Sequence, residues 1–224
     1  MPDKSHELSP IELSIFSNRI EAVCDEMGAV LQRTAFSPNI KDRLDFSCAV
    51  FDTQGQLNAQ AAHIPVHMGS MAYAMQNIVT QLQWRPGDMV LLNDPYLGGT
   101  HLPDVTLIAP LYIAGELVAF VANRAHHADI GAQTPGSMPI SQSLQEEGLI
   151  IAPTFLVQQG VLEHSYLDQL ANQTANREQT IGDFKVDKWV KLKLITFLEP
   201  ILFFLGNTKF GRPFKSSFLI GDNL

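Results

Sequence analysis

The chain has 224 residues, of which 46% are hydrophobic and 17% are charged, a balance that predicts a folded domain with a sizeable core and excludes a disordered chain. The formal net charge is -8 and no lysine- or arginine-rich run forms a basic patch, which argues against nucleic acid as a partner. Segment 1–10 is polar and no apolar run approaches the ~20 residues of a membrane span, so we expect neither a signal peptide nor a membrane helix.

A long helix is predicted close to the start of the chain. Ser9 is suited to cap it, Pro10 fits the first turn, and Glu12 occupies the reciprocal position of a capping box. Apolar residues then recur with helical spacing up to Leu31, so we expect the helix to extend to about Thr34 and to pack one face on the core.

The two cysteines of the chain are Cys24 and Cys48. They show no CxxC spacing, and neither has a cysteine or histidine close by in the sequence. We therefore expect two buried, reduced thiols, as in a cytoplasmic protein.

Two antiparallel hairpins are predicted after the first helix. Apolar residues alternate over 46–51, a turn is expected at 52–55, and a returning strand at 56–61. The apolar runs 105–113 and 117–123 are separated by Ala114-Gly115, which predicts the second hairpin.

The remaining segments predict helices interleaved with these hairpins. A helix is expected at residues 70–82 and a short buried strand at 89–92. An outer strand is expected at 149–157 and a second helix at 165–175. Pro153 argues against a central place in the sheet for the outer strand. The fold class predicted is therefore mixed α/β (α+β), with an N-terminal helix followed by antiparallel hairpins and interleaved helices.

Carboxylates and imidazoles gather in two loops of the central region. His101 and Asp104 are three residues apart, and their side chains can reach one point if the Leu102-Pro103 segment turns the backbone. The second hairpin would bring the segment that carries His126 and His127 back to the same end of the sheet. Imidazole and carboxylate ligands suit Zn²⁺ or Mn²⁺, and three protein ligands with one open position are what a hydrolytic metal centre needs.

Neighbouring residues of a strand point to opposite faces, so only one of His126 and His127 is expected to be a ligand. The other is then available as a general base or as a partner of a ligand. The alternative interpretation of the whole set is a hydrogen-bonded polar loop that shapes a turn.

Two further pairs of polar residues precede this region. Spacing alone favours a structural role for His63 and His67, because Pro65 between them is incompatible with a helical metal-binding pair. Spacing alone likewise favours a turn cap and a surface ion pair for Asp42 and Asp45.

Several of these segments resemble the hydantoinase B/5-oxoprolinase family, and they occur in the order in which that family has them. The segments are DFSCA at 45–49, HIPVHMGSM at 63–71, NDPY with GGTHLPD within 93–104, RAHHADIG at 124–131 and PGSM at 135–138. The resemblance predicts an N-terminal portion of a hydantoinase B/oxoprolinase-like domain at 8–183. Residues 184–224 match nothing in the family, and we interpret them as the unmatched tail of a truncated or frame-disrupted product.

The resemblance implies a cytoplasmic subunit that opens hydantoin or 5-oxoproline rings beside a hydantoinase A-type partner. In that family the partner binds ATP and phosphorylates the lactam or cyclic imide oxygen, and the B component completes ring opening. The rivals are a subunit of an acetone or acetophenone carboxylase and a catalytically inactive fragment.

The resemblance also implies a divalent metal, Zn²⁺ or Mn²⁺, in this chain. Its expected ligands are His101, Asp104 and His126, with Asp42 as a fourth where the family more often has glutamate. In the implied reaction a metal-bound water attacks the phosphorylated carbonyl carbon, and His127 or Asp129 handles the proton.

Overall fold

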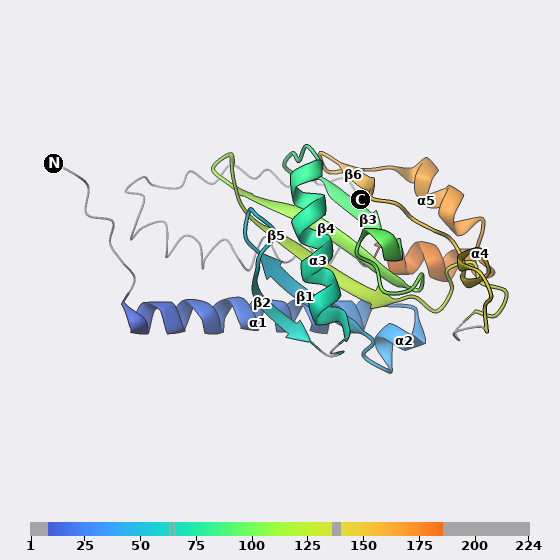
Figure 1. The fold of residues 1–224 in the computed structure, drawn as a ribbon, viewed down its shortest axis with the longest axis horizontal. Helices are drawn as coiled ribbons and strands as arrows, with labels where there is room; N and C mark the ends of the chain where they lie inside the picture. Colours follow the sequence, from blue (N-terminus) through green and yellow to red (C-terminus); the bar gives the residue numbers. More distant parts are fainter. Residues whose placement is uncertain (1–8, 63, 65, 136–139, 186–224) are drawn as a thin grey trace.

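The computed structural model describes residues 9–62, 64, 66–135 and 140–185 (Figure 1). They form one seven-stranded antiparallel sheet with helices packed against it, which confirms the predicted mixed fold class. The helices are α1 (Pro10–Thr34), α2 (Pro38–Lys41), α3 (Val66–Gln81), α4 (Leu144–Glu147), α5 (His164–Ala171), the 3-10 turn η1 (Pro95–Leu97) and a further helical segment at 177–185. The strands are β1 (Phe46–Phe51), β2 (Leu57–Ala62), β3 (Met89–Leu92), β4 (Asp104–Ile113), β5 (Glu116–His126), β6 (Thr154–Gln158) and β7 (Val161–Leu162).

Strand order in the sheet is β2-β1-β5-β4-β3-β6-β7. Both predicted hairpins are present, as β1–β2 and β4–β5, and the chain reverses between the latter at Ala114 and Gly115, which have φ of 52° and 86°. Strand β1 also pairs with β5, with Phe46 opposite Ala125. This pairing joins the two hairpins into one sheet and places their ends together.

The two faces of the sheet carry different helices. Cys48 and Val50 of β1 share a core with α1, whereas Ala49 and Phe51 share a core with Met75 and other residues of α3. Figure 1 shows α3 lying across the sheet and α1 running beyond its edge at the N-terminal end. Alternation along each strand therefore decides which layer a side chain joins.

Helix α1 has the predicted bounds, and its first turns stand apart from the core. Ile11, Leu13 and Ile15 are exposed, while the buried apolar stripe begins at Ile20. Among the described residues, no helix combines the length and hydropathy needed to cross a membrane. Both cysteines are buried, as predicted.

The other elements differ from the prediction mainly at their ends. Helix α3 begins at Val66, four residues before the predicted start, and β6 covers only the second half of the predicted strand. The residue Pro153 immediately precedes β6, so it takes no place within the ladder. β6 lies next to the outermost strand, β7, and not at the centre of the sheet.

The last described residues of the chain pack near the junction of α1 and α2. The Asp183 carboxylate accepts the backbone N–H groups of Phe36 and Ser37 at 2.7 and 3.0 Å, and the Ser37 hydroxyl accepts the N–H of Ala128. Phe184 is buried in the core on the α1 face. Phe184 and Lys185 are the only described residues of the tail predicted at 184–224, and residues 186–224 lie outside the described part of the chain.

Candidate metal centre

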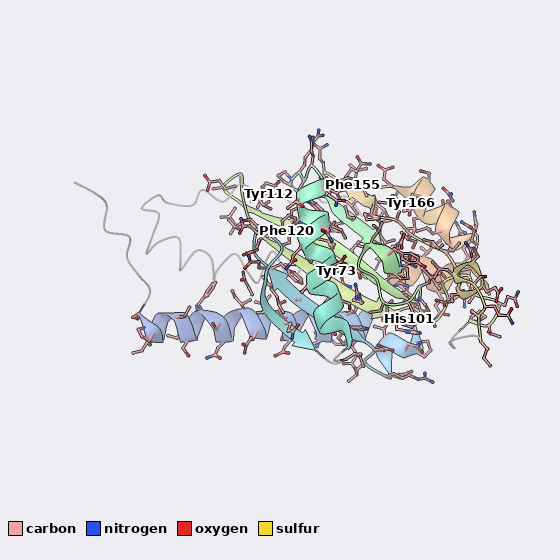
Figure 2. All side chains as sticks on the ribbon, in the orientation of Figure 1. Tyr73, His101, Tyr112, Phe120, Phe155 and Tyr166 are labelled. Carbon is pink, nitrogen blue, oxygen red and sulfur yellow. The ribbon has the colours of Figure 1, made fainter. Side chains whose placement is uncertain are left out.

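The candidate site forms where three strand ends meet beside the first turn of α3. Strand β4 begins at Asp104, β5 ends at His126, and these two residues are register partners. The backbone N–H of His126 also donates to the carbonyl of Asp45, directly before β1, at 2.9 Å. His67 enters from the first turn of α3. Figure 2 shows His101 at the same end of the sheet, with Tyr112 toward the other end.

The carboxylate of Asp104 is the centre of this cluster. Its Oδ1 lies 2.8 Å from Nε2 of His101 and 3.2 Å from Nδ1 of His126. Its Oδ2 lies 3.3 Å from Nε2 of His67 and also accepts the hydroxyl of Thr100. The backbone N–H of Asp104 donates to the carbonyl of His101 at 3.0 Å, so the chain turns between them, as the convergence of their side chains requires.

The surroundings set the charge of this carboxylate. Burial by itself raises the pKa of Asp104, but hydrogen bonds from His101, His126 and His67 outweigh it and hold the pKa far below its usual range. Burial lowers the pKa of His101, yet the hydrogen bond and charge of Asp104 together with the charge of Asp45 give a net upward shift. Asp104 is therefore an ionised acceptor at neutral pH.

Donor chemistry fits a divalent cation. Ligand atoms of His101, Asp104 and His126 lie within 4.8 Å of one another, and so do those of Asp45, His67 and Asp104. Imidazole nitrogens and carboxylate oxygens are a donor set for Zn²⁺ or Mn²⁺. His101 and Asp45 each have 28% of their side-chain surface exposed, whereas Asp104 has 3%, so the cluster opens to solvent on the side of the first two.

A buried arginine supports the loop that carries His101. Arg124 on β5 is fully buried, and its guanidinium donates to the Gly98 carbonyl at 2.7 Å, to the Thr106 hydroxyl at 2.8 Å and to the Ser70 hydroxyl. Burial lowers its pKa to about 10, while the charge of Asp104 acts in the opposite direction. The guanidinium is therefore still cationic at neutral pH and ties β4, β5, α3 and the loop together.

Glycines allow this loop to lie close to its neighbours. Gly98 has φ of 108°, and a Cβ there would lie 2.3 Å from Cβ of Ala74 on α3. A Cβ on Gly99 would lie 2.2 Å from the Asn93 carbonyl oxygen. The same Asn93 is fully buried, and its amide nitrogen donates to the Leu102 carbonyl at 2.7 Å. The loop is thus fixed at both ends around His101.

The predicted fourth ligand, Asp42, is not in the cluster. It is exposed at the C-cap of α2, where its backbone N–H donates to the Pro38 carbonyl at 2.9 Å. Strand β1 begins four residues later, and its pairing with β5 brings Asp45, three residues after Asp42, to His126 instead. Strand pairing therefore selects Asp45 as the acid nearest the site.

The predicted proton-handling residues also lie elsewhere. His127 is buried, and its ring packs against Phe184 with centroids 4.9 Å apart, on the face opposite His126. Asp129 is buried and accepts the backbone N–H groups of Gly131 and Asn176, each at 2.9 Å. Alternation predicts that the two adjacent histidines point to opposite faces, and the structure places His126 in the site and His127 against Phe184 in the core.

Residue spacing alone predicts other roles for two residues of the cluster, His67 and Asp45. His67 lies at the start of α3, and a stronger weight on Pro65 as a helix-start signal would have placed it on the first turn. Asp45 belongs to the segment that leads into β1, and only the β1–β5 pairing reveals its neighbours. His63 lies outside the described residues.

Comparisons of the sequence with known proteins match this chain to one protein family. A family model described as Hydantoinase B/oxoprolinase matches residues 9–187. A 5-oxoprolinase of Dictyostelium discoideum is 43% identical over 199 residues, which are 88% of this chain and 16% of that protein.

Two solved structures have a similar fold. The ATP-dependent caprolactamase from Pseudomonas jessenii has a TM-score of 0.79 and 27% identity, covering 88% of this chain and 34% of that chain. A nucleotide-free acetone carboxylase has a TM-score of 0.69 and 22% identity, covering 84% of this chain and 26% of that chain, and at this identity the likeness concerns the fold alone. This chain spans 16%, 34% and 26% of the length of these three proteins.

Proposed function

The chain belongs to the hydantoinase B/oxoprolinase family, and we propose that it contributes the metal-binding part of an ATP-dependent hydrolase of cyclic amides. A hydantoinase A-type partner would bind ATP and phosphorylate the amide oxygen, and this chain would complete ring opening. The substrates proposed are hydantoin or 5-oxoproline. The observation that carries the proposal is the cluster of a partly exposed His101 with the buried Asp104 and His126 on this family's fold.

We propose that His101, Asp104 and His126 hold a divalent cation, Zn²⁺ or Mn²⁺, with Asp45 in place of Asp42 as the additional acid. A cation of this kind supplies Lewis acidity and brings the pKa of a bound water to ~7. The ionised carboxylate of Asp104 supplies the negative charge, and the imidazoles of His101 and His126 direct ring nitrogens toward it.

The surrounding residues prepare the cluster for substrate. His101 and Asp45 form its solvent-facing side, so an activated amide would approach there. The Arg124 guanidinium holds the Gly98 carbonyl and so positions the loop that ends in His101. Because the cluster is mostly buried, hydrogen bonds and charges within it are stronger than they would be in water.

The carboxylase predicted as a rival has the same fold, so a substrate test separates the two activities. The full chain is combined with an A-type partner and ATP, and offered 5-oxoproline, hydantoin, or acetone with bicarbonate. We expect ADP release and a ring-opened product from a cyclic amide. Carboxylation of the ketone instead would support the rival, and full metal occupancy without either product would support an inactive fragment.

His101→Ala is the matched variant for this assay. We expect the variant to lose bound metal and ring opening together, because His101 contributes both a ligand nitrogen and a contact to Asp104. A suitable control is His164→Ala, since His164 is exposed at the start of α5 and outside the cluster. Metal retained at the original stoichiometry by His101→Ala would refute the ligand assignment. The cytoplasmic location predicted for the enzyme stays a prediction.

A further inference from the structure

The last described residues of the chain hold two distant parts of the fold together. Oδ1 of the Asp183 carboxylate accepts the backbone N–H groups of Phe36 and Ser37 at 2.7 and 3.0 Å. The ring of the next residue, Phe184, packs against the ring of His127 with centroids 4.9 Å apart. These residues therefore contact both the chain that leads into α2 and the chain that follows β5.

Asp183 holds the start of α2 from outside the helix. Ser37 directly precedes α2, and serine at this position usually caps a helix with its own hydroxyl. Within the described helix α2 the Ser37 side chain makes no capping hydrogen bond, and its hydroxyl accepts the backbone N–H of Ala128 instead. Ser37 and Asp183 are both buried, with 0% and 3% of their surfaces exposed. The start of α2 is thus held by Asp183 and is joined through Ser37 to the end of β5.

Two further backbone hydrogen bonds connect α2 to the metal centre. The carbonyl of Asn39 in α2 accepts the N–H of Asp45 at 3.0 Å, and the carbonyl of Asp45 accepts the N–H of His126 at 2.9 Å. The Asp45 carboxylate lies 3.7 Å from Nδ1 of His126 and 3.9 Å from Nε2 of His67. The position of α2 therefore determines where Asp45 lies beside the cluster.

We propose that Asp183 is a positioning residue for the metal centre and acts through α2 and Asp45. Its carboxylate holds the N–H groups before α2, and so fixes the Asn39 carbonyl to which Asp45 is bonded. The backbone of His126 is fixed in turn by Asp45. The inference rests on the proposed function, because it concerns the metal centre proposed there. Asp183 acts at a distance, through backbone hydrogen bonds, and not as a ligand.

The shortness of α2 makes this support necessary. The helix has only four residues, and a helix of that length is not stable without contacts from the rest of the fold. Loss of the Asp183 carboxylate would also leave the buried N–H of Ser37 without this acceptor, which is unfavourable unless the chain moves. Groups outside the ligand set that orient metal ligands typically change metal affinity by ~10–100-fold when they are lost.

The competing interpretation is that Asp183 only stabilises the fold. Asp88 provides a matched control, because it is also a buried carboxylate that accepts two backbone N–H groups. Those groups belong to Arg85 and Gln159, at 2.7 and 2.8 Å. Asp88 directly precedes β3, at the opposite end of that strand from the loop that carries His101. Asp183→Ala and Asp88→Ala should therefore both lower the urea midpoint, measured by circular dichroism.

Binding of Co²⁺ distinguishes the two interpretations, because its visible absorption depends on the geometry of its ligands. The full chain is stripped of metal with a chelator and titrated with Co²⁺. Asp183→Ala should weaken binding by ~10-fold or more and change the spectrum at saturation, whereas Asp88→Ala should change neither.

Two milder variants test the same connection in a chain that is less destabilised. Asp183→Asn keeps an Oδ1 that can accept both N–H groups, so it should retain most of the Co²⁺ affinity and the original spectrum. Ser37→Ala removes the hydroxyl that accepts the N–H of Ala128, so it should change the spectrum in the same direction as Asp183→Ala.

A further measurement requires no metal. Hydrogen exchange of the metal-free chain, followed at each residue by nuclear magnetic resonance, reports the opening of the bonds from the N–H groups of Asp45 and His126. Asp183→Ala should accelerate exchange at these two amides more than in the rest of the sheet. Asp88→Ala should not single them out.

The possible failures are distinguishable. An unchanged Co²⁺ spectrum and affinity in Asp183→Ala, or in Ser37→Ala if Asp183→Ala is unfolded, would overturn the positioning role and leave the metal centre standing. No tight binding of Co²⁺ by the unchanged protein would overturn the metal centre of the proposed function, and the positioning role with it.

Discussion

Asp104 and His126 are register partners across β4 and β5, with Oδ1 of the carboxylate 3.2 Å from Nδ1 of the ring. They are 22 residues apart in the chain, so the hairpin itself brings them together. Thr106 and Arg124 lie two positions away on the same strands and bond to each other, and Arg124 also donates to Ser70 of α3. Because alternate residues of a strand point to the same face, Asp104 and His126 face α3 as well. The site is thus a product of strand register, and a shift by one residue would disassemble it.

Replacing the shared carboxylate tests its central position. Asp104→Asn removes the negative charge between three imidazoles, so we expect metal affinity to fall by at least ~100-fold. Calorimetric titration with Zn²⁺ measures this. Asp129→Asn is the matched control, because Asp129 is also buried but its carboxylate accepts backbone N–H groups of the loop residues Gly131 and Asn176. An equal loss of metal affinity in both variants would contradict the central position of Asp104 in the metal centre.

Arg124 should be essential to the stability of the loop. Arg124→Met leaves the Gly98 carbonyl and the Thr106 hydroxyl without the guanidinium, so we expect a loss of about 2–4 kcal/mol in the free energy of unfolding. Urea denaturation measures the loss, and metal affinity should fall with it. Arg124→Lys keeps the charge but not the three-way geometry, and should restore only part of either quantity.

The control for this prediction is the exposed arginine Arg177. Its bond to Asp168 joins two side chains that are each about half exposed, so Arg177→Met should cost no more than about 1 kcal/mol. If Arg124→Met were equally mild, the buried guanidinium would have no structural role.

Backbone geometry at Gly98 yields a prediction about sterics. Alanine there must adopt a positive φ and place its Cβ 2.3 Å from Cβ of Ala74, so Gly98→Ala should cost about 2–4 kcal/mol and weaken metal binding. Gly115→Ala shares the positive φ but meets no atom within 4 Å, and should cost only about 1 kcal/mol without affecting the metal. Thermal unfolding with and without metal compares the two, and equal effects would show that the contact with α3 is unimportant.

Local patterns were sufficient for half of the candidate site. The apolar runs around Ala114-Gly115 predict the hairpin, and the hairpin implies that His101 and Asp104 converge with either His126 or His127. The family resemblance selects His126. Alternation along the strand implies that the two histidines point to opposite faces, and the structure places His127 against Phe184. These relations depend on residues close in sequence or on one turn, where periodicity and turn chemistry carry the information.

The remaining half depends on contacts between distant segments. Nothing in the segment around Asp45 indicates that β1 pairs with β5, because the two strands are separated by β2, α3, β3 and β4. That pairing excludes Asp42 and includes Asp45. His67 joins the site only because α3 begins at Val66 and packs across the same face of the sheet. Long-range pairing and helix docking are tertiary effects that residue spacing does not encode.

The buried thiol of Cys24 predicts how stability changes at alkaline pH. Burial, assisted by the charge of Asp25, raises the pKa of Cys24 from 9.0 to about 12. Between these values the unfolded chain releases a proton that the folded chain retains. The stabilising contribution is therefore complete below pH 9.0 and is lost as the pH rises toward about 12, at up to about 1.4 kcal/mol per pH unit.

Cys24→Ala isolates this contribution, because alanine cannot ionise in either state. We expect the variant to be less stable than the unchanged protein at about pH 8, since a buried sulfur is lost from the core. The difference in the free energy of unfolding between the two proteins should then narrow by more than about 1 kcal/mol at about pH 10.5. At that pH only the unchanged protein is destabilised by keeping a thiol protonated that ionises in the unfolded chain. Urea midpoints at the two pH values measure the narrowing, and other titrating groups cancel in the comparison. A constant difference would mean that the thiol ionises as easily in the folded chain as in the unfolded one.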